Sequence, residues 1–173
     1  MRIVFKPICS RHFAIRYSPL AIVMHVVLYQ PEIPPNTGSI ARLCAATCTP
    51  LHLIAPLGFS IDDKQLKRAG LDYWPYVEVR LHASWEEFLK EENGKRLLLF
   101  SKKAAQSYTR AAYHEEDFLV FGPETRGLPQ ELLNTHRERS YRIPMMSQEV
   151  RSLNLSNAVS IVLYEALRQL GKV

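Results

Sequence analysis

The sequence lacks any apolar run that approaches the length of a membrane span, and it holds only three cysteines. A transmembrane helix needs about 20 consecutive apolar residues, so we expect no membrane association. Three cysteines cannot all pair with one another, and a reduced protein of the cytoplasm is the simplest interpretation. Cys44 and Cys48 would share one face of a helix, but no second pair of ligands lies nearby in the sequence. We therefore expect core residues there and no metal site.

Several phosphate-binding and catalytic motifs are missing as well. The seven glycines form neither G-x-G-x-x-G nor G-x-x-x-x-G-K-[ST]. This argues against an ordinary Rossmann dinucleotide site and against a P-loop nucleotide site. The sequence also has no nucleophile elbow, and its candidate active-site loops hold no histidine. These absences weaken hydrolase interpretations.

Acidic side chains are missing from residues 1–23, which hold four of the 22 lysines and arginines. Residues 24–173 carry 18 basic and 17 acidic side chains, so the net charge of +5 does not describe a basic field over the whole molecule. Charge alone is therefore no argument for nucleic-acid binding. Because residues 1–23 show no sustained periodicity, we predict a poorly ordered extension there and one globular domain over residues 24–173.

From Met24 onward, apolar runs alternate with helical patterns. The predicted strands are Val26–Tyr29, Leu51–Ala55, Tyr76–Val79, Leu97–Ser101, Phe118–Gly122 and Tyr141–Ile143. The predicted helices are Thr37–Thr47, Asp63–Ala69, Ser84–Glu92, Pro129–Thr135 and a C-terminal helix with an apolar stripe from Leu155 to Leu170. Lys102–Glu116 reads as a loop with at most one helical turn. This alternation predicts an α/β fold with a parallel sheet flanked by helices.

Ligands of parallel α/β sheets bind where loops leave the carboxyl ends of the strands. The first such loop runs from Gln30 to Arg42, and its prolines stiffen the backbone. Asn36 is a candidate cap for the following helix, and Arg42 supplies a cation that suits a phosphate. A stiff turn with an exposed arginine is an equally good interpretation of this segment alone.

Two further loops carry polar side chains. Gly122 ends a buried strand and lets the backbone approach a ligand closely, while Glu124 and Arg126 present charge just beyond it. A solvent-exposed turn with a salt bridge is the alternative. In the segment 142–157, Ser152 or Asn154 is a candidate N-cap for the C-terminal helix. A capped terminal helix that only closes the core is the simpler interpretation of that segment by itself.

Three long motifs in this order resemble the signature motifs of the SPOUT superfamily of RNA methyltransferases. The motifs are PEIPPNTGSIARLCAATCTPLHLIAPLGF, FGPETRGLP and RIPMMSQEVRSLNLSNAVSIVLYEALRQ, and DDKQLKRAGLDYW between them adds support. More narrowly, the sequence from Met24 onward resembles the small single-domain tRNA 2'-O-methyltransferases that modify the wobble nucleotide. Residues 1–23 have no counterpart in this resemblance.

The resemblance implies a C-terminal deep trefoil knot in the parallel sheet, a rare exception to ordinary chain connections. It implies S-adenosylmethionine bound inside the knot and a homodimer formed through the first and last helices. The implied cofactor contacts are Phe100, Ser101, Lys102, Gly122, Glu124, Ile143, Met145, Ser152 and Leu153.

The resemblance also implies a set of functional polar residues, namely Asn36, Arg42, Glu124, Ser152 and Asn154. A guanidinium holds its proton with a pKa above about 12. We therefore interpret Arg42 as a phosphate clamp and a stabiliser of alkoxide charge rather than as a general base.

The implied reaction moves a methyl group from S-adenosylmethionine to a ribose 2'-OH. The implied acceptor is nucleotide 34, a cytidine or a carboxymethylaminomethyluridine, in the anticodon stem-loop of tRNA. Such a reaction asks the protein to orient the hydroxyl and to exclude water. The alternatives are the same chemistry on another tRNA or rRNA nucleotide and a non-catalytic RNA-binding protein on the same fold.

Overall fold

A computed structural model describes residues 24–60 and 76–173. The predicted extension, residues 1–23, and the predicted helix Asp63–Ala69 lie outside the described residues. The strands are β1 (His25–Tyr29), β2 (Leu51–Ile54), β3 (Val79–His82), β4 (Leu97–Phe100), β5 (Gln106–Ser107), β6 (Phe118–Phe121) and β7 (Ser140–Arg142). The helices are α1 (Pro34–Ala46), α3 (Trp85–Glu91), α4 (Gln130–Thr135) and α5 (Leu155–Gln169), with 3-10 turns at Tyr108–Arg110 and Arg137–Arg139.

Within the described part of the chain, the strands form one seven-stranded sheet in the order β3-β2-β1-β6-β4-β7-β5. Every neighbouring pair runs parallel, so the predicted α/β fold with a parallel sheet is confirmed. In the register of β1 and β6, His25 lies opposite Phe118 and Leu28 opposite Phe121. Because all strands point the same way, the loops after β1, β4, β6 and β7 leave from one edge of the sheet, which we call the carboxyl edge.

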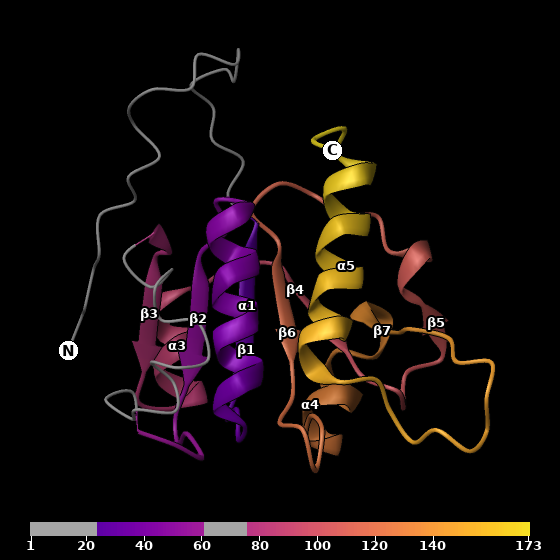
Figure 1. Cartoon of the computed structure of the whole chain (residues 1–173), viewed down its shortest axis with the longest axis horizontal. Helices are drawn as coiled ribbons and strands as arrows, with labels where there is room; N and C mark the ends of the chain where they lie inside the picture. The colour runs from indigo at the N-terminus through magenta and orange to yellow at the C-terminus, as the bar shows by residue number, and fades with distance from the viewer. Residues whose placement is uncertain (1–23, 61–75) are drawn as a thin grey trace.

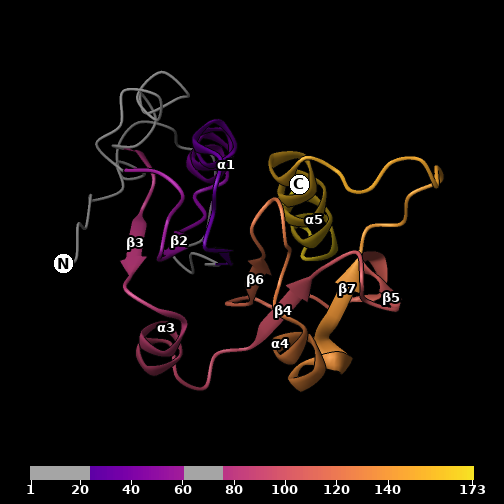
Figure 2. The same cartoon turned by 90° about the horizontal axis from the view of Figure 1, so that it is seen from below.

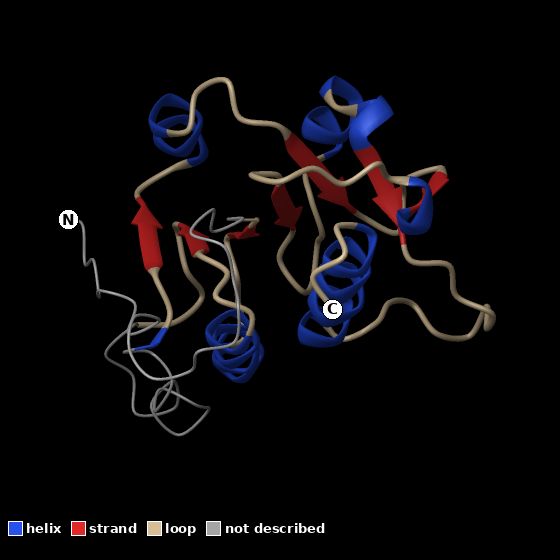
Figure 3. Cartoon of the chain, turned by 90° about the horizontal axis from the view of Figure 1, so that it is seen from above, coloured by secondary structure: helices blue, strands red, loops and turns tan. Residues whose placement is uncertain are grey.

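Helices cover both faces of the sheet. The first and last helices, α1 and α5, contact each other over one face, and α3 and α4 cover the other (Figure 1 and Figure 2). Figure 3 shows the strands running between these two helix layers. A sheet covered in this way has no solvated face, which explains why its strands read as continuous apolar runs.

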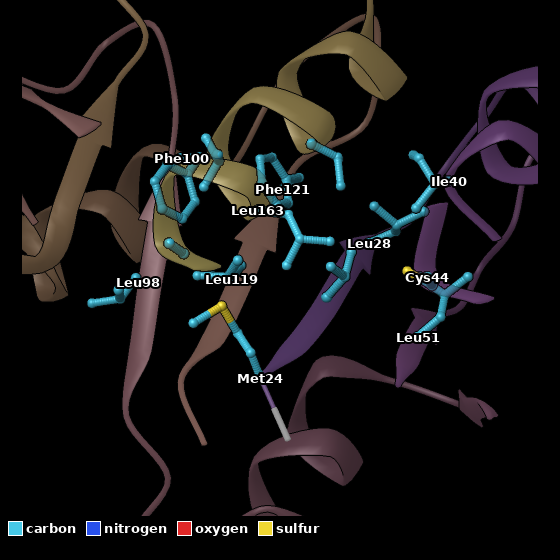
Figure 4. Close-up of a cluster of buried hydrophobic side chains, with 14 of the residues drawn as sticks. Met24, Leu28, Ile40, Cys44, Leu51, Leu98, Phe100, Leu119, Phe121 and Leu163 are labelled. Carbon is cyan, nitrogen blue, oxygen red and sulfur yellow. The ribbon is translucent and has the colours of Figure 1, made fainter. Parts of the chain in front are cut away.

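Alternate residues of each strand face the two helix layers. Leu28 of β1 packs in a core with Ile40 of α1 and Leu163 of α5 (Figure 4). Its neighbour Val27 packs in a second core with Phe88 of α3. Burying an aliphatic or aromatic side chain of this size stabilises the fold by roughly 1.5–3 kcal/mol relative to leaving it exposed. The two cores therefore attach both helix layers to the sheet.

The first helix begins earlier than the predicted start at Thr37. Pro34 and Pro35 occupy its first turn, where a missing N–H costs nothing because the first amides of a helix have no intrahelical acceptor. Asn36 consequently lies inside the first turn, and its predicted capping role is wrong. The N-cap is Ile33, which makes no side-chain capping hydrogen bond.

The remaining differences from the predicted elements are local. Cys44 is buried as expected, but Cys48 lies beyond the end of α1 with a φ of 51° and is exposed, so a core role is wrong for Cys48. The strand predicted at Tyr76–Val79 instead begins at Val79. In the predicted loop Lys102–Glu116, the prediction missed β5, because two polar residues at a sheet edge carry no apolar signal.

No described helix, in residues 24–60 or 76–173, has both the length and the apolar composition to cross a membrane.

Candidate active site

A cavity of about 790 Å³ opens at the carboxyl edge, beside the loops that follow β4, β6 and β7. Most of its wall comes from four segments, residues 100–103, 121–127, 143–145 and 151–155. Ile33 and Asn36 add the start of α1, and Ala158 adds the first turns of α5. The cavity thus collects parts of all three motifs.

The nine residues predicted to contact a cofactor all line this cavity. They are Phe100, Ser101, Lys102, Gly122, Glu124, Ile143, Met145, Ser152 and Leu153. The wall combines aromatic and aliphatic side chains with a few polar and charged groups, and both the volume and this mixture are typical of small-molecule sites. Cofactor binding by these residues remains a prediction, but their convergence on one cavity is a property of the fold.

Gly122 is required by the packing of its own loop. A Cβ atom at this position would lie 2.3 Å from the backbone nitrogen of Leu128 and 2.5 Å from the carbonyl carbon of Gly127. Neither neighbour is a flexible side chain, so only glycine fits. This packing within one loop accounts for the glycine, and the predicted close approach of backbone to a ligand at Gly122, which also lines the cavity, stays a prediction.

The carboxylate of Glu124 fastens the loop after β6 to the loop after β1. Its Oε2 accepts a hydrogen bond from the backbone N–H of Glu32 at 2.8 Å, and its Oε1 accepts one from Asn36 Nδ2 at 2.9 Å. The backbone N–H of Ile33 lies 3.3 Å from Oε1. Because Pro34 and Pro35 have no amide hydrogen, the nearest backbone donors are the N–H groups of Glu32 and Ile33, directly before the helix, and Glu124 accepts from these. A carboxylate at this place also interacts favourably with the positive end of the helix dipole.

Asn36 extends this network to the third motif. The buried Asn36 accepts a hydrogen bond through Oδ1 from Asn154 Nδ2 at 2.9 Å. Asn154 in turn caps α5, because its Oδ1 accepts from the backbone N–H of Ser156 at 2.9 Å and of Asn157 at 3.4 Å. Of the two N-cap candidates for α5, Asn154 is confirmed. One row of side chains, Glu124–Asn36–Asn154, therefore joins segments that lie 88 and 118 residues apart in the chain.

Glu32 contributes a second connection between the same two loops, one that no sequence pattern predicted. Its carboxylate accepts from the backbone N–H of Thr125 at 3.0 Å and from Thr125 Oγ1 at 2.9 Å and 2.7 Å. Arg126 Nε lies 3.7 Å from Glu32 Oε1. The hydrogen bond from the Thr125 hydroxyl is the main cause that lowers the pKa of Glu32 below its ordinary value. Sequence spacing gives no signal for a pair 93 residues apart.

Arg42 is the one predicted catalytic residue that the structure leaves outside the cavity wall. The helix that carries it starts at the cavity and runs away from it, and six residues beyond Asn36 correspond to about 9 Å along the helix axis. Ile40 and Ala41 are fully buried against the sheet, whereas the Arg42 side chain lies on the exposed side of α1. The other four, Asn36, Glu124, Ser152 and Asn154, line the cavity together.

Cationic side chains surround the cavity. Lys102, Lys103, Arg126 and Arg151 all lie on its wall and are exposed. Lys102 Nζ also donates to the backbone carbonyl of Arg151 at 3.2 Å, which ties the loop after β4 to the loop before α5. Lysine and arginine at the rim of a pocket suit the phosphates of a nucleic-acid backbone, which position a substrate without reading its sequence.

The comparisons with known proteins agree with this geometry. The model of the SpoU rRNA Methylase family matches residues 23–164. The tRNA (cytidine(34)-2'-O)-methyltransferase of Methylovorus glucosotrophus (strain SIP3-4) is 53% identical over 145 residues, which cover 83% of this chain and 94% of the relative. The protein of the same name from Escherichia coli (strain K12) is 51% identical over 150 residues, covering 86% of this chain and 95% of the relative.

Solved structures match over the same range. The structure described as "Structural insights into the 2-OH methylation of C/U34 on tRNA" has a TM-score of 0.82 and 51% identity, covering 87% of this chain and 98% of that chain. A second structure, described as an RNA 2'-O ribose methyltransferase, has a TM-score of 0.75 and 27% identity, covering 91% of this chain and 60% of that chain. The resemblance predicted from the three motifs is thus confirmed, and this chain belongs to the SpoU rRNA Methylase family.

Proposed function

We propose that this protein is an S-adenosylmethionine-dependent tRNA 2'-O-ribose methyltransferase of the cytoplasm that acts on the wobble nucleotide. The acceptor is the ribose 2'-OH of position 34, a cytidine or a carboxymethylaminomethyluridine, in the anticodon stem-loop. We assign the activity to residues 24–173. The observation that carries the proposal is the convergence of Asn36, Glu124, Ser152 and Asn154 on one cavity. Relatives about half identical over nearly their whole length, named for this activity, support it.

The residues present fit the cofactor. A cavity of about 790 Å³ has room for a nucleoside-sized molecule, since small-molecule pockets span about 300–1,000 Å³. Phe100 and Leu153 offer apolar surface to a base, while Ser101 and Ser152 offer hydroxyl groups. When bound, S-adenosylmethionine supplies an electrophilic methyl group on a positively charged sulfur.

The chain's own residues orient the acceptor and hold the loops around it. Lys102, Arg126 and Arg151 face the solvent at the cavity rim, where they can hold the phosphates on either side of the acceptor ribose. Glu124 is a poor candidate for the proton acceptor because both of its oxygens accept hydrogen bonds from the first loop. Its contribution is to keep Asn36 and the cavity wall in place before the substrate arrives, which lowers the reorganisation that the reaction requires.

The proposal includes a homodimer formed through α1 and α5. Ile161 and Tyr164 of α5 are 37% and 47% exposed, an apolar surface on the helix layer that α1 shares. Arg42 lies on the exposed side of that same layer, so a second copy could bring it into a composite site. Sedimentation equilibrium tests the dimer: Tyr164→Lys should shift the protein toward a monomer, whereas Leu89→Lys on α3 should not. A wild-type monomer at micromolar concentration would contradict this part of the proposal.

The trefoil knot is also part of the proposal. Strand β7 pairs between β4 and β5, and residues 143–154 then lead to α5, which packs back against β6 (Figure 1). A segment that wraps around the cavity in this way places Met145 and Leu153 on the same wall as Phe100.

The direct test is methyl transfer to tRNA from cells that lack this protein. Purified protein and S-adenosylmethionine should add one 2'-O-methyl group at position 34, mapped by resistance of the neighbouring phosphodiester to alkaline cleavage. Methylation at another nucleotide would establish the chemistry and refute the assigned position. Tight RNA binding without any cofactor binding in calorimetry would leave a non-catalytic RNA-binding protein on this fold.

A further inference from the structure

Glu32 and Glu124 lie in neighbouring loops beside the cavity, and each one holds the loop of the other. Glu124, in the loop after β6, accepts from the backbone N–H of Glu32. Glu32, in the loop after β1, accepts from the backbone N–H and the hydroxyl of Thr125, the residue next to Glu124. Each carboxylate therefore accepts hydrogen bonds from donors in the other loop. We call these reciprocal contacts between Glu32 and Glu124–Thr125 the carboxylate latch.

We propose that Glu32 is a positioning residue for methyl transfer, which acts by holding Thr125 and Arg126 at the cavity wall. The inference rests on the proposed function and extends it to a residue outside the wall itself. Thr125 and Arg126 line the cavity and Glu32 does not. Glu32 is therefore connected to the cavity wall through Thr125 and Arg126, which its carboxylate contacts, and through Glu124, which accepts from its backbone N–H.

The backbone of Glu32 is itself held from the opposite side. A Cβ atom on Gly58, in the loop after β2, would lie 2.7 Å from the Cα of Glu32. The backbone N–H of Gly58 also donates to the carbonyl of Pro31 at 2.9 Å. The first loop is thus packed between the loop after β2 and the loop after β6. A carboxylate carried on such a fixed backbone sets where Thr125 lies.

The latch adds side-chain hydrogen bonds between two loops whose own contacts are mainly backbone hydrogen bonds, such as the one from the N–H of Gly127 to the carbonyl of Pro123. The N-cap of α1, Ile33, has no side-chain hydrogen bond, and two prolines follow it. On the other side, Thr125 and Arg126 are exposed residues in a turn. Hydrogen bonds to a charged group are roughly twice as strong as neutral ones. Two carboxylates with five donors between them are therefore the main polar connection at this edge of the cavity.

Arg126 links the latch to the substrate. Its Nε lies 3.7 Å from Glu32 Oε1, while most of its side chain is exposed at the rim. Glu32 thereby contacts Nε of the Arg126 guanidinium and leaves its terminal nitrogens available for an RNA phosphate. Without the Glu32 carboxylate, the Arg126 side chain should no longer be held in one orientation. The rate should then fall, because the reaction depends on how the substrate is oriented.

The experiment compares Glu32→Ala, Glu32→Gln and Thr125→Val with the matched control Glu131→Ala. Glu131 is an exposed glutamate on α4 that lies outside the cavity wall. At saturating S-adenosylmethionine and RNA, we expect kcat to fall at least tenfold in Glu32→Ala. Glu32→Gln keeps one acceptor oxygen for Thr125 and should recover most of the rate, and Glu131→Ala should stay within twofold of wild type. Thr125→Val removes the hydroxyl and should add little to the loss in the double variant with Glu32→Ala.

Hydrogen–deuterium exchange of the same full-length proteins tests the latch independently of catalysis. Glu32→Ala should accelerate exchange in peptides covering residues 122–128, while the sheet peptides covering β1 and β4 stay protected. Unchanged exchange in residues 122–128 would refute the latch. Faster exchange with an unchanged kcat would refute the positioning role, as would a rate loss that only follows a lower melting temperature. A wild-type protein that transfers no methyl group would refute the proposed function, and the exchange result would still decide the latch.

Discussion

Two polar clusters join distant parts of this chain, and they differ in what surrounds them. The network of Glu32, Glu124, Asn36 and Asn154 lies at the carboxyl edge and opens on the cavity. The other cluster is a row of histidines, one from each of β1, β2 and β3, buried beneath α3. Burial of polar groups therefore does not by itself mark a functional site, since of these two clusters only the first contributes side chains to the cavity wall.

The histidine row consists of His25, His52 and His82. His25 Nδ1 lies 2.8 Å from His52 Nε2, and His52 Nδ1 lies 2.9 Å from His82 Nε2. His82 Nδ1 then lies 3.1 Å from Glu91 Oε2, although not along a good hydrogen-bond direction. Because a carboxylate only accepts, we assign the proton of each neutral ring to Nδ1, so that the donors point along the row toward Glu91.

Burial keeps the histidine row neutral. It is the main cause that lowers the pKa of His25 to about 4, and it also lowers the pKa of His52 and His82 below the ordinary value. Phe88 and Phe118 enclose the rings. We therefore assign the histidine row to stability and the network at the carboxyl edge to activity. Three substitutions and one change of pH test this assignment.

Phe88→Ala should have the largest effect, and it should fall on stability alone. The fully buried Phe88 ring packs against His52, His82 and Phe118. Its loss should lower the free energy of unfolding by about 3–5 kcal/mol, as for other buried aromatic residues. Urea denaturation measures this change, and calorimetry at low temperature should find cofactor affinity within twofold of wild type.

Two variants accompany this experiment. Phe88→Leu leaves a smaller cavity and serves if the alanine variant does not fold. Leu89→Ala, at a 40% exposed neighbour on α3, should lower stability by less than about 1 kcal/mol. Weaker cofactor binding by a folded Phe88→Leu protein would contradict the separation of the two regions.

Glu124→Ala should instead affect activity more than stability. It leaves two backbone amides and Asn36 Nδ2 without their acceptor. We expect methyl transfer to the anticodon stem-loop to fall about 100-fold, which corresponds to about 2.7 kcal/mol. Single-turnover rates at saturating cofactor measure the effect, with Glu138→Ala as an exposed control. Activity within threefold of wild type would remove Glu124 from the functional site.

Lowering the pH should destabilise the protein through the histidine row. The unfolded chain takes up protons as the pH falls through about 6.5, whereas the folded His25 stays neutral down to about pH 4. The unfolded state then binds more protons, so stability is present above pH 6.5 and is lost as the pH falls toward 4. His25 alone should account for a loss on the order of 2 kcal/mol between pH 7 and pH 5.

Urea denaturation at several pH values measures this loss. His25→Gln should reduce the pH dependence between 7 and 5, and His114→Gln, an exposed control, should not. Equal pH dependence in both variants would show that the row does not carry the effect.

Arg126→Ala should have the smallest effect of the four, and it should be seen mainly in RNA binding. Any loss of kcat should stay below that of Glu32→Ala, which releases Thr125 as well as Arg126. Its side chain is 69% exposed at the cavity rim. We expect KM for the anticodon stem-loop to rise about 3- to 10-fold, and the slope of log affinity against log salt to decrease by about one. Titrations at several salt concentrations measure both. Lys90→Ala, on α3 away from the cavity, is the matched control, and an equal effect of both variants would contradict a phosphate contact at Arg126.

Much of the fold could be read from the sequence because it depends on local patterns. Apolar runs such as Leu97–Ser101 and Phe118–Gly122 predicted strands that the structure ends one residue earlier. Asn154 was one of two candidate caps because a short polar side chain at a helix start has few other roles. The prediction failed where local preference misled: Pro34 and Pro35 were placed before a helix that they begin.

The candidate site likewise has a part that the sequence predicted and a part that it did not. The motifs named Asn36, Glu124, Ser152 and Asn154, and all four line one cavity. They gave no sign that Glu32 holds Thr125, or that Arg42 lies outside the wall of the cavity in its own chain. Those facts depend on which loops the parallel sheet brings to one edge.

The sequence by itself determined most of the described strands and helices, the parallel sheet and the family, because each of these rests on residue periodicity or on contiguous motifs. Only the tertiary structure decided which acid pairs with which amide across the loops, and that three histidines from separate strands form one row. Hydrogen-bond partners 27 to 118 residues apart meet only after the strands have paired in register. That register follows from the burial of both faces of the sheet at once.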